Sequence, residues 1–119
     1  MTGNAMEIAE STVDAVLVLS PRGRLDSIGA PDFDRLVRER LAAGQRRLVI
    51  DLDAVDYVSS AGLRSLLVAA KQLKANGGRM ALCRLKAPVM EVVHISGFDR
   101  IFTILASLDD GVARVGAEP

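Results

Sequence analysis

Two adjacent serines, Ser59 and Ser60, precede an amphipathic stretch that begins near Ala61. A serine at a helix start accepts hydrogen bonds from free N–H groups of the first turn, and capping alone justifies one of the two. A phosphate on the second hydroxyl would also be well placed, because those N–H groups and the helix dipole favour negative charge. Arg64, four residues beyond Ser60, would lie in reach of it. The spacing therefore predicts either a simple cap or a modification site.

Three acids, Asp51, Asp53 and Asp56, come just before the serines. Asp51 and Asp53 alternate on one side of an extended segment, and carboxylate oxygens are ligands that Mg²⁺ prefers. A solvated strand end with turn-forming aspartates is the favoured interpretation. A ligand site stays the alternative, because ligands of open α/β sheets bind at such an edge.

The remaining chemistry is sparse. The motifs GxxxxGK[ST], GxGxxG and GxSxG are all missing, and one Cys with one His cannot build a closed zinc site. Cys83 lies among apolar residues of an expected strand and is predicted to be a small buried side chain. His94 is predicted to have a structural or surface role. We therefore expect no catalytic residue, no metal and no cofactor, and a protein that is not an enzyme.

Composition narrows the classes further. The chain has 119 residues, 15 Lys+Arg against 15 Asp+Glu, and a hydrophobic fraction of 50%. Net charge zero argues against direct nucleic-acid binding, and no apolar run approaches the roughly 20 residues of a membrane-spanning helix. The N-terminal MTGNAMEIAE does not resemble a secretory signal. With one Cys, these features favour a cytoplasmic protein in a reducing compartment.

Hydrophobic periodicity supplies the elements that position these residues. The pattern predicts the order β-β-α-β-α-β-α-β-α, an α/β domain with a mixed, mostly parallel sheet of about five strands. It spans residues 6–116 as one domain, with flexible termini at 1–5 and 117–119. A Pro/Gly-punctuated loop is expected over 21–31, and the continuous run AVLVLS indicates a strand covered on both faces. The five strands are expected at Met6–Ala9, Ala15–Leu19, Arg47–Asp51, Arg79–Leu85 and Ile101–Leu105.

Helices fill the intervals between strands. The first carries Phe33 and Val37 and is closed by Gly44, and the second runs from about Ala61 to an Asn-Gly-Gly stop. The third starts at Pro88 and stops at Gly97, and LDDGVARV is expected to form a short terminal helix.

Four segments in a fixed order carry a resemblance to a known family. They are GRLD at Gly23–Asp26, DLDAVDYVSSAGLRSLL from Asp51, NGG at Asn76–Gly78 and SGF at Ser96–Phe98. From about Met6 to Leu108, this set resembles the STAS domain of anti-sigma factor antagonists of the SpoIIAA and RsbV type. The expected strand and helix order is compatible with the STAS fold.

The resemblance implies particular site residues. It places the phospho-acceptor at Ser60, and leaves Ser59 as a competing acceptor because many members carry an aspartate there. The implied partner-binding residues are Asp26, Ser59, Ala61, Gly62, Leu63 and Arg64.

The implied function is partner switching. The unphosphorylated protein would bind an anti-sigma serine kinase of the GHKL type and release its client, phosphorylation at Ser60 would block binding, and a PP2C-type phosphatase would reset the serine. The main alternative is a non-switching STAS accessory subunit of a phospholipid ABC transport complex. A small-ligand or nucleotide-binding STAS domain is supported only by Asp51 and Asp53.

Overall fold

The computed structural model describes residues 6–117. Of the termini predicted to be flexible, 1–5 and 117–119, all but residue 117 lie outside the described residues. The described chain has a radius of gyration of 13.1 Å and extents of 36 × 36 × 23 Å. None of its helices combines the length and the apolar character needed to cross a membrane.

The first two predicted strands form a β-hairpin that opens the fold, and both are longer than the sequence pattern indicates. β1 (Glu7–Val13) and β2 (Val16–Leu25) pair antiparallel. They are joined at Asp14 and Ala15, whose φ angles are 50° and 68°. Two successive positive φ values give a tight hairpin turn that matches the twist of the strands.

The sheet is six-stranded, and every pairing other than β1–β2 is parallel. Its order is β1-β2-β3-β5-β6, and β4 pairs with the end of β2. The predicted α/β class with a mixed, mostly parallel sheet is confirmed. The later elements are α1 (Ala30–Ala42), β3 (Arg47–Asp51), β4 (Val55–Val58), α2 (Ser60–Ala75), β5 (Arg79–Cys83), α3 (Ala87–Ile95), the 3₁₀ turn η1 (Phe98–Arg100), β6 (Ile104–Leu105) and α4 (Leu108–Gly116).

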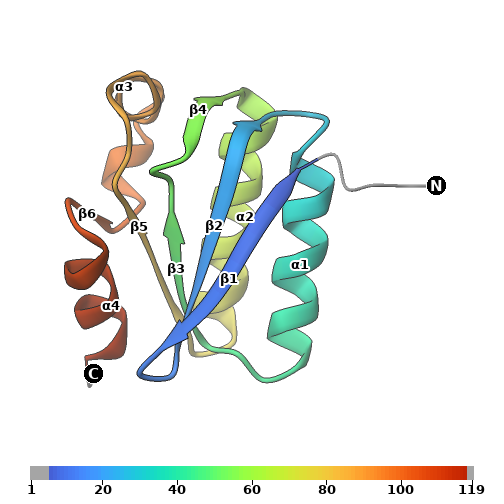
Figure 1. The fold of residues 1–119 in the computed structure, drawn as a ribbon, viewed down its shortest axis with the longest axis vertical. Coiled ribbons are helices and arrows are strands. Elements are labelled where there is room, and N and C mark those ends of the chain that lie inside the picture. The colour runs from blue at the N-terminus through green and yellow to red at the C-terminus, as the bar shows by residue number, and fades with distance from the viewer. Residues whose placement is uncertain (1–5, 118–119) are drawn as a thin grey trace.

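Both faces of the central strands are covered, which explains the continuous apolar run in β2. Leu17 and Leu19 belong to the larger core, which packs α1, α2 and α3 against the sheet. Val16 and Val18 face the opposite way, into a smaller core that includes Val115 of α4. Figure 1 shows α4 on the opposite side of the sheet from α1 and α2.

The predicted loop over 21–31 is wrong in its first half. β2 continues through Leu25 because its last residues pair with β4, an extra strand that the sequence pattern missed. The ladder is irregular between Gly23 and Arg24, and Gly23 has a φ of 95° that favours glycine. The pairing with β4 places the last residue of β2 next to the start of α2.

The last strands are shorter than predicted. β5 ends at Cys83 instead of Leu85, since Arg84 takes a left-handed φ of 56°. β6 covers only Ile104 and Leu105, because the chain before it forms η1 and the Phe102 N–H donates to the Phe98 carbonyl at 3.0 Å. One edge of the sheet is therefore only half covered.

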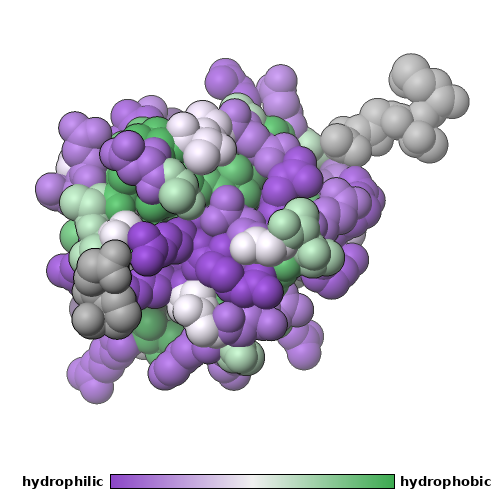
Figure 2. Space-filling view, turned by 90° about the horizontal axis from the view of Figure 1, so that it is seen from below, coloured by the Kyte–Doolittle hydropathy of each residue, from purple (hydrophilic) through white to green (hydrophobic). Residues whose placement is uncertain are grey.

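Helix ends follow the predicted chemistry. Gly44, with a φ of 101°, closes α1 as predicted, and its N–H donates to the Leu41 carbonyl at 3.0 Å. The next N–H, of Gln45, donates to Arg40 at 2.9 Å, which completes a Schellman arrangement. Seen from below, the end of the molecule where α2 terminates is largely hydrophilic, with hydrophobic surface visible between polar side chains (Figure 2).

Candidate functional site

The two serines at the start of α2 are in different states. Ser59 is the N-cap, and its Oγ accepts a hydrogen bond from the Gly62 N–H at 3.2 Å. Ser60 is the first residue of the helix and is exposed. Capping therefore accounts for Ser59 and leaves the Ser60 hydroxyl facing solvent. The first turn of α2 contains no acid, and its earliest N–H groups have no acceptor within the helix.

Gly62 has a steric role that capping does not explain. A Cβ at this position would overlap the carbonyl oxygen of Leu25 and approach Cγ1 of Val58 to 3.0 Å. The same Leu25 carbonyl accepts a hydrogen bond from the Ser59 N–H at 3.0 Å. Only glycine lets α2 start directly against the end of β2. Its neighbour Leu63 is buried in the core.

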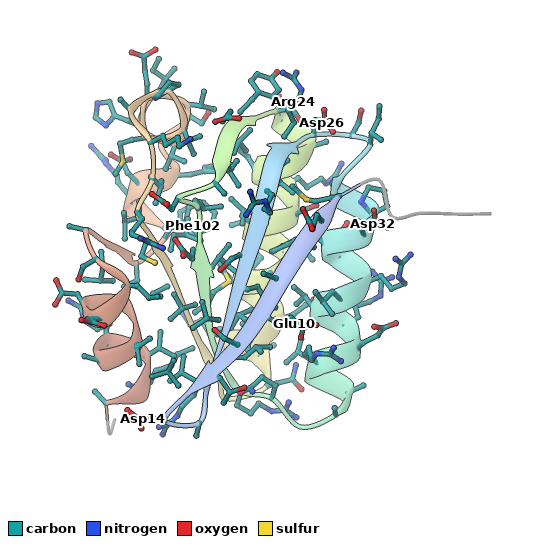
Figure 3. All side chains as sticks on the ribbon, in the orientation of Figure 1. Glu10, Asp14, Arg24, Asp26, Asp32 and Phe102 are labelled. Atoms are coloured by element: carbon teal, nitrogen blue, oxygen red, sulfur yellow. The ribbon has the colours of Figure 1, made fainter. Side chains whose placement is uncertain are left out.

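Asp26 lies immediately after this contact and shapes the loop that leads to α1. Its Oδ1 accepts hydrogen bonds from the N–H groups of Ile28 at 3.1 Å and Gly29 at 3.0 Å. The Nε of Arg24 lies 3.4 Å from Oδ2, and Figure 3 shows the two side chains together at the end of β2. The Gly29 N–H is the main reason that the pKa of this carboxyl falls below its ordinary range, with Ile28 and Arg24 adding to it.

A groove lies between the loop that follows Asp26 and the start of α2. Parallel pairing of Leu25 with Val58 places the Asp26 loop beside the start of α2. The groove between α1 and α2 has a volume of about 540 Å³ and contains one acid, Asp34, and one base, Arg64. Its lining is completed by Ser27, Ala30, Pro31, Ser60, Ala61, Ser65 and Val68. The groove is lined mainly by small and polar side chains, with one charge of each sign.

Three exposed apolar or aromatic side chains lie on the groove or near Asp26, and the sequence pattern did not indicate them. Ile28 is 70% exposed in the Asp26 loop, and Val68 is 40% exposed on the groove wall. Tyr57 is 41% exposed, and the Arg24 guanidinium lies 4.2 Å from its ring centroid. The signal that could have revealed them is an apolar residue on a polar helix face or in a Gly/Pro loop.

Asp51, Asp53 and Asp56 all form ion pairs with cations that are distant in the sequence. Asp51 is buried and accepts two hydrogen bonds from Arg84, at 3.0 Å from Nε and 2.6 Å from Nη2. Asp56 is bonded by the Lys86 amino group at 2.9 Å, which lowers the pKa of its carboxyl. Asp53 is exposed, 3.9 Å from Arg84. Over residues 6–117 no group of three or more potential ligands could hold a metal ion.

Cys83 and His94 lie away from the serines. Cys83 is fully buried between the sheet and α4, and burial raises the pKa of its thiol to about 12. This confirms the predicted buried apolar role. His94 is exposed on α3, with Nδ1 2.7 Å from Asp99. The only imidazole of the sequence is thus engaged on a different helix from Ser60.

Comparison with known proteins identifies one family. The STAS domain family matches residues 7–111. A Bordetella bronchiseptica protein named as an anti-sigma factor antagonist, BtrV, is 38% identical over 108 residues, covering 91% of this chain and 93% of the relative. The anti-sigma-F factor antagonist RsfB of Mycobacterium tuberculosis is 28% identical over 102 residues, covering 86% of this chain and 83% of its own.

Solved structures share the fold at lower identity. An anti-sigma factor antagonist from Mycobacterium paratuberculosis superposes with a TM-score of 0.86 at 24% identity, over 98% of this chain and 100% of that one. SpoIIAA in its unphosphorylated form gives a TM-score of 0.73 at 17% identity, over 95% and 99% of the two chains. At these identities the likeness concerns the fold alone.

Proposed function

The chain belongs to the STAS domain family, and we propose that it is an anti-sigma factor antagonist whose partner binding is switched by phosphorylation of Ser60. The unphosphorylated form binds an anti-sigma serine kinase of the GHKL type, and that kinase then releases its client. Phosphorylation blocks this binding, and a PP2C-type phosphatase restores it. The relatives named as anti-sigma factor antagonists support this role.

The observation that carries the proposal is the division of labour between the serines. The Ser59 hydroxyl is engaged as the helix cap, whereas Ser60 is exposed on the wall of the groove. A kinase can reach Ser60 without unwinding α2. Ser59 is only partly exposed, and its hydroxyl already accepts the hydrogen bond from the Gly62 N–H, so it is less accessible to a kinase than Ser60. Ser60 is therefore the preferred acceptor.

Phosphoryl transfer at Ser60 needs groups that the partner supplies. The Ser60 Oγ attacks the γ-phosphorus of ATP held by the kinase, its proton passes to a base of the kinase, and the bond to the ADP oxygen breaks. In the reverse branch, water on the phosphatase attacks the phosphoserine phosphorus, the bond from phosphorus to the Ser60 Oγ breaks, the Oγ takes up a proton, and inorganic phosphate is released. In this proposal the kinase and the phosphatase supply the catalytic groups, and this chain is the substrate of both reactions.

Phosphorylation of Ser60 changes the charge of the groove strongly, because the groove has no net charge beforehand. Asp34 and Arg64 balance one another before modification, and a phosphoserine adds about −1.5 to −2 charges at neutral pH. The free N–H groups of the first turn and Arg64 stabilise this phosphate within the same fold. A docked partner surface that faces Ser60 must instead desolvate the charge, and each 1.4 kcal/mol of penalty weakens binding about tenfold.

The decisive experiment uses the cognate anti-sigma kinase, ATP and matched serine variants. Mass spectrometry should locate one phosphate on Ser60 in the wild type and in the Ser59→Ala variant. The Ser60→Ala variant should carry no phosphate. In a binding assay, Ser60→Ala should bind the kinase like the unmodified protein. Ser60→Asp should bind at least about tenfold more weakly.

The control is Ser65→Ala, since Ser65 lies on the same groove but is buried. It should be phosphorylated like the wild type. A phosphate found on Ser59, or unchanged affinity of Ser60→Asp for the kinase, would overturn the proposed switch. In that case the same groove would serve a non-switching partner.

A further inference from the structure

The edge of β5 is half open. Leu82 and Cys83 pair with β6, whereas Arg79, Met80 and Ala81 have β3 as their only strand neighbour among the described residues. Backbone groups of a parallel strand alternate between its two sides. The Arg79 N–H donates to Arg46 on the β3 side at 2.8 Å, and the Leu82 N–H donates to Thr103 on the β6 side at 2.8 Å. The Met80 amide therefore points toward the open side.

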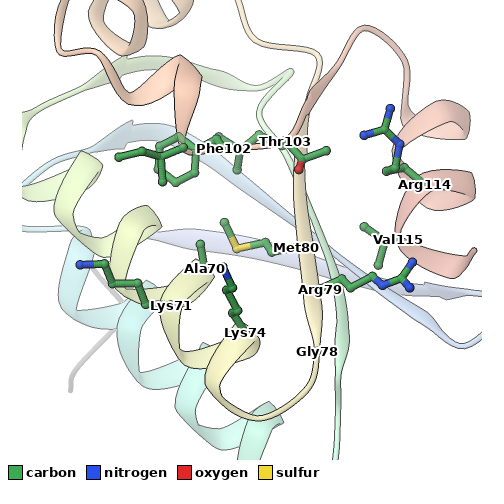
Figure 4. A pocket seen from close by; sticks show the side chains of 12 residues that line it. Ala70, Lys71, Lys74, Gly78, Arg79, Met80, Phe102, Thr103, Arg114 and Val115 are labelled. Atoms are coloured by element: carbon green, nitrogen blue, oxygen red, sulfur yellow. The ribbon is translucent and has the colours of Figure 1, made fainter. Parts of the chain in front are cut away.

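A cavity of about 550 Å³ lies along this open edge. It straddles the sheet: α2 forms one wall and α4 forms the other, with β5 between them (Figure 4). Its floor is apolar, including Ala70, Met80, Phe102 and Val115. Ile101, which is 55% exposed, stands at the end where β6 approaches. This is ample space for a few residues of extended chain.

Among residues 6–117, every charged side chain that lines the cavity is positive. Lys71 and Lys74 come from α2, and Arg79 and Arg114 come from the α4 side of the sheet. No acid lines the cavity, and none of these four cations is in an ion pair within residues 6–117. Arg79 donates to the Ala117 carbonyl at 2.6 Å, which is an uncharged acceptor.

We propose that the open edge of β5 binds an acidic, extended segment of a partner protein by strand addition. Main-chain hydrogen bonds to the Met80 side of β5 supply the pairing, and side chains that alternate between the two faces meet the lysines on one face and the arginines on the other. This site is separate from the proposed switch. Lys74 lies about 21 Å from Ser60 along α2, at a rise of about 1.5 Å per residue.

The distribution of the cations favours a strand over a small molecule. One carboxylate of a fatty acid could meet the lysines or the arginines, which lie on opposite faces of the sheet, but not both. A second copy of this chain is also a poor occupant. Its own edge strand β1 carries Glu7 and Glu10, which are already paired with Arg22 and Arg40.

The experiment titrates ¹⁵N-labelled protein with a capped peptide, acetyl-Thr-Glu-Glu-Val-Glu-Glu-Thr-amide. Amide shifts should concentrate at residues 78–82 and 101–103. Two variants, Lys74→Glu and Arg114→Glu, should each weaken binding about tenfold. The first reverses a charge on the α2 face of the sheet, and the second reverses a charge on the α4 face. The matched control Arg38→Glu reverses an exposed charge on α1 and should change the affinity less than about twofold.

A second peptide separates strand pairing from charge attraction. N-methylation of its valine keeps all four carboxylates but blocks a main-chain hydrogen bond, and it should weaken binding about tenfold. Equal binding of both peptides would overturn strand addition. Two other results would also overturn the proposal. One is that decanoate shifts the amides of residues 78–82 and the peptide does not. The other is that the protein self-associates with increasing concentration and buries residues 78–82. Ser60→Asp should leave peptide binding unchanged, so that failure here and failure of the switch are distinguishable.

Discussion

Replacing Gly62 with alanine tests the steric coupling between α2 and the end of β2. The new Cβ would overlap the Leu25 carbonyl oxygen and lie 3.0 Å from Val58 Cγ1. The obstacle is backbone held in a strand pairing, so no side-chain rotation relieves it. Either the first turn of α2 or the β2–β4 ladder has to shift.

Two effects of opposite sign decide the outcome. Alanine is favoured over glycine inside a helix by about 1 kcal/mol. Overpacking costs about 1–3 kcal/mol, and displacement of the Ser59 N–H from the Leu25 carbonyl, now 3.0 Å away, costs about 1 kcal/mol more. We expect a net loss of about 2–3 kcal/mol in the free energy of unfolding, because a clash with fixed backbone lies at the upper end of that range.

Urea denaturation followed by circular dichroism measures this loss as a fall in midpoint of about 1–2 M. The matched control is Gly111→Ala in α4, where a Cβ would meet Val49 Cγ1 at 3.4 Å and Cys83 Cβ at 3.6 Å. These are ordinary contacts, so helix propensity should win there and stability should stay equal or rise by up to about 1 kcal/mol. A Gly62→Ala protein as stable as the wild type would refute the steric argument.

Two further measurements test the site's surroundings. The pKa of Asp26 lies below its ordinary 3.8, so its contribution to stability is complete above that value and is lost as the pH falls through the lowered folded pKa. Asp26→Asn should therefore destabilise the protein at neutral pH and flatten the acid loss of stability between about pH 4 and pH 2, measured by urea denaturation; an unchanged slope would contradict this. Cys83, fully buried and with a thiol pKa of about 12, should resist iodoacetamide at about pH 8 while the urea-unfolded chain is labelled fully; equal labelling rates in both states would contradict its burial.

The sequence predicts elements well where local patterning and packing agree. The bounds predicted for Arg47–Asp51 match β3, and Gly44 ends α1 as its position indicates. β4 was missed because only its first and last residues are buried, and its existence depends on pairing with the end of β2. The predicted fifth strand lacks its first three residues, because residues 101–103 follow η1 as a turn and Phe102 is buried in the core.

The candidate site was only partly predictable. Serine capping and the closeness of Ser60 to a basic residue follow from spacing along one helix. Which serine caps could not be decided from spacing, because it depends on where the helix begins relative to Leu25. The role of Gly62 is likewise set by a contact with a strand distant in sequence. Ile28 gave no periodic signal, because its exposure results from the Asp26 turn.

The charge pattern of the sequence takes on its meaning only in three dimensions. Residues 51–56 are acidic and 64–86 are basic, yet Arg84 and Lys86 return to pair with Asp51 and Asp56. The remaining bases of this segment on α2 lie apart: Arg64 is beside Ser60, whereas Lys71 and Lys74 are about 17 and 21 Å from Ser60 by the helical rise. That separation exceeds the screening length of about 8 Å at physiological ionic strength. A phosphate on Ser60 therefore acts on its own groove, and a partner at the β5 edge can stay bound in either state of the proposed switch.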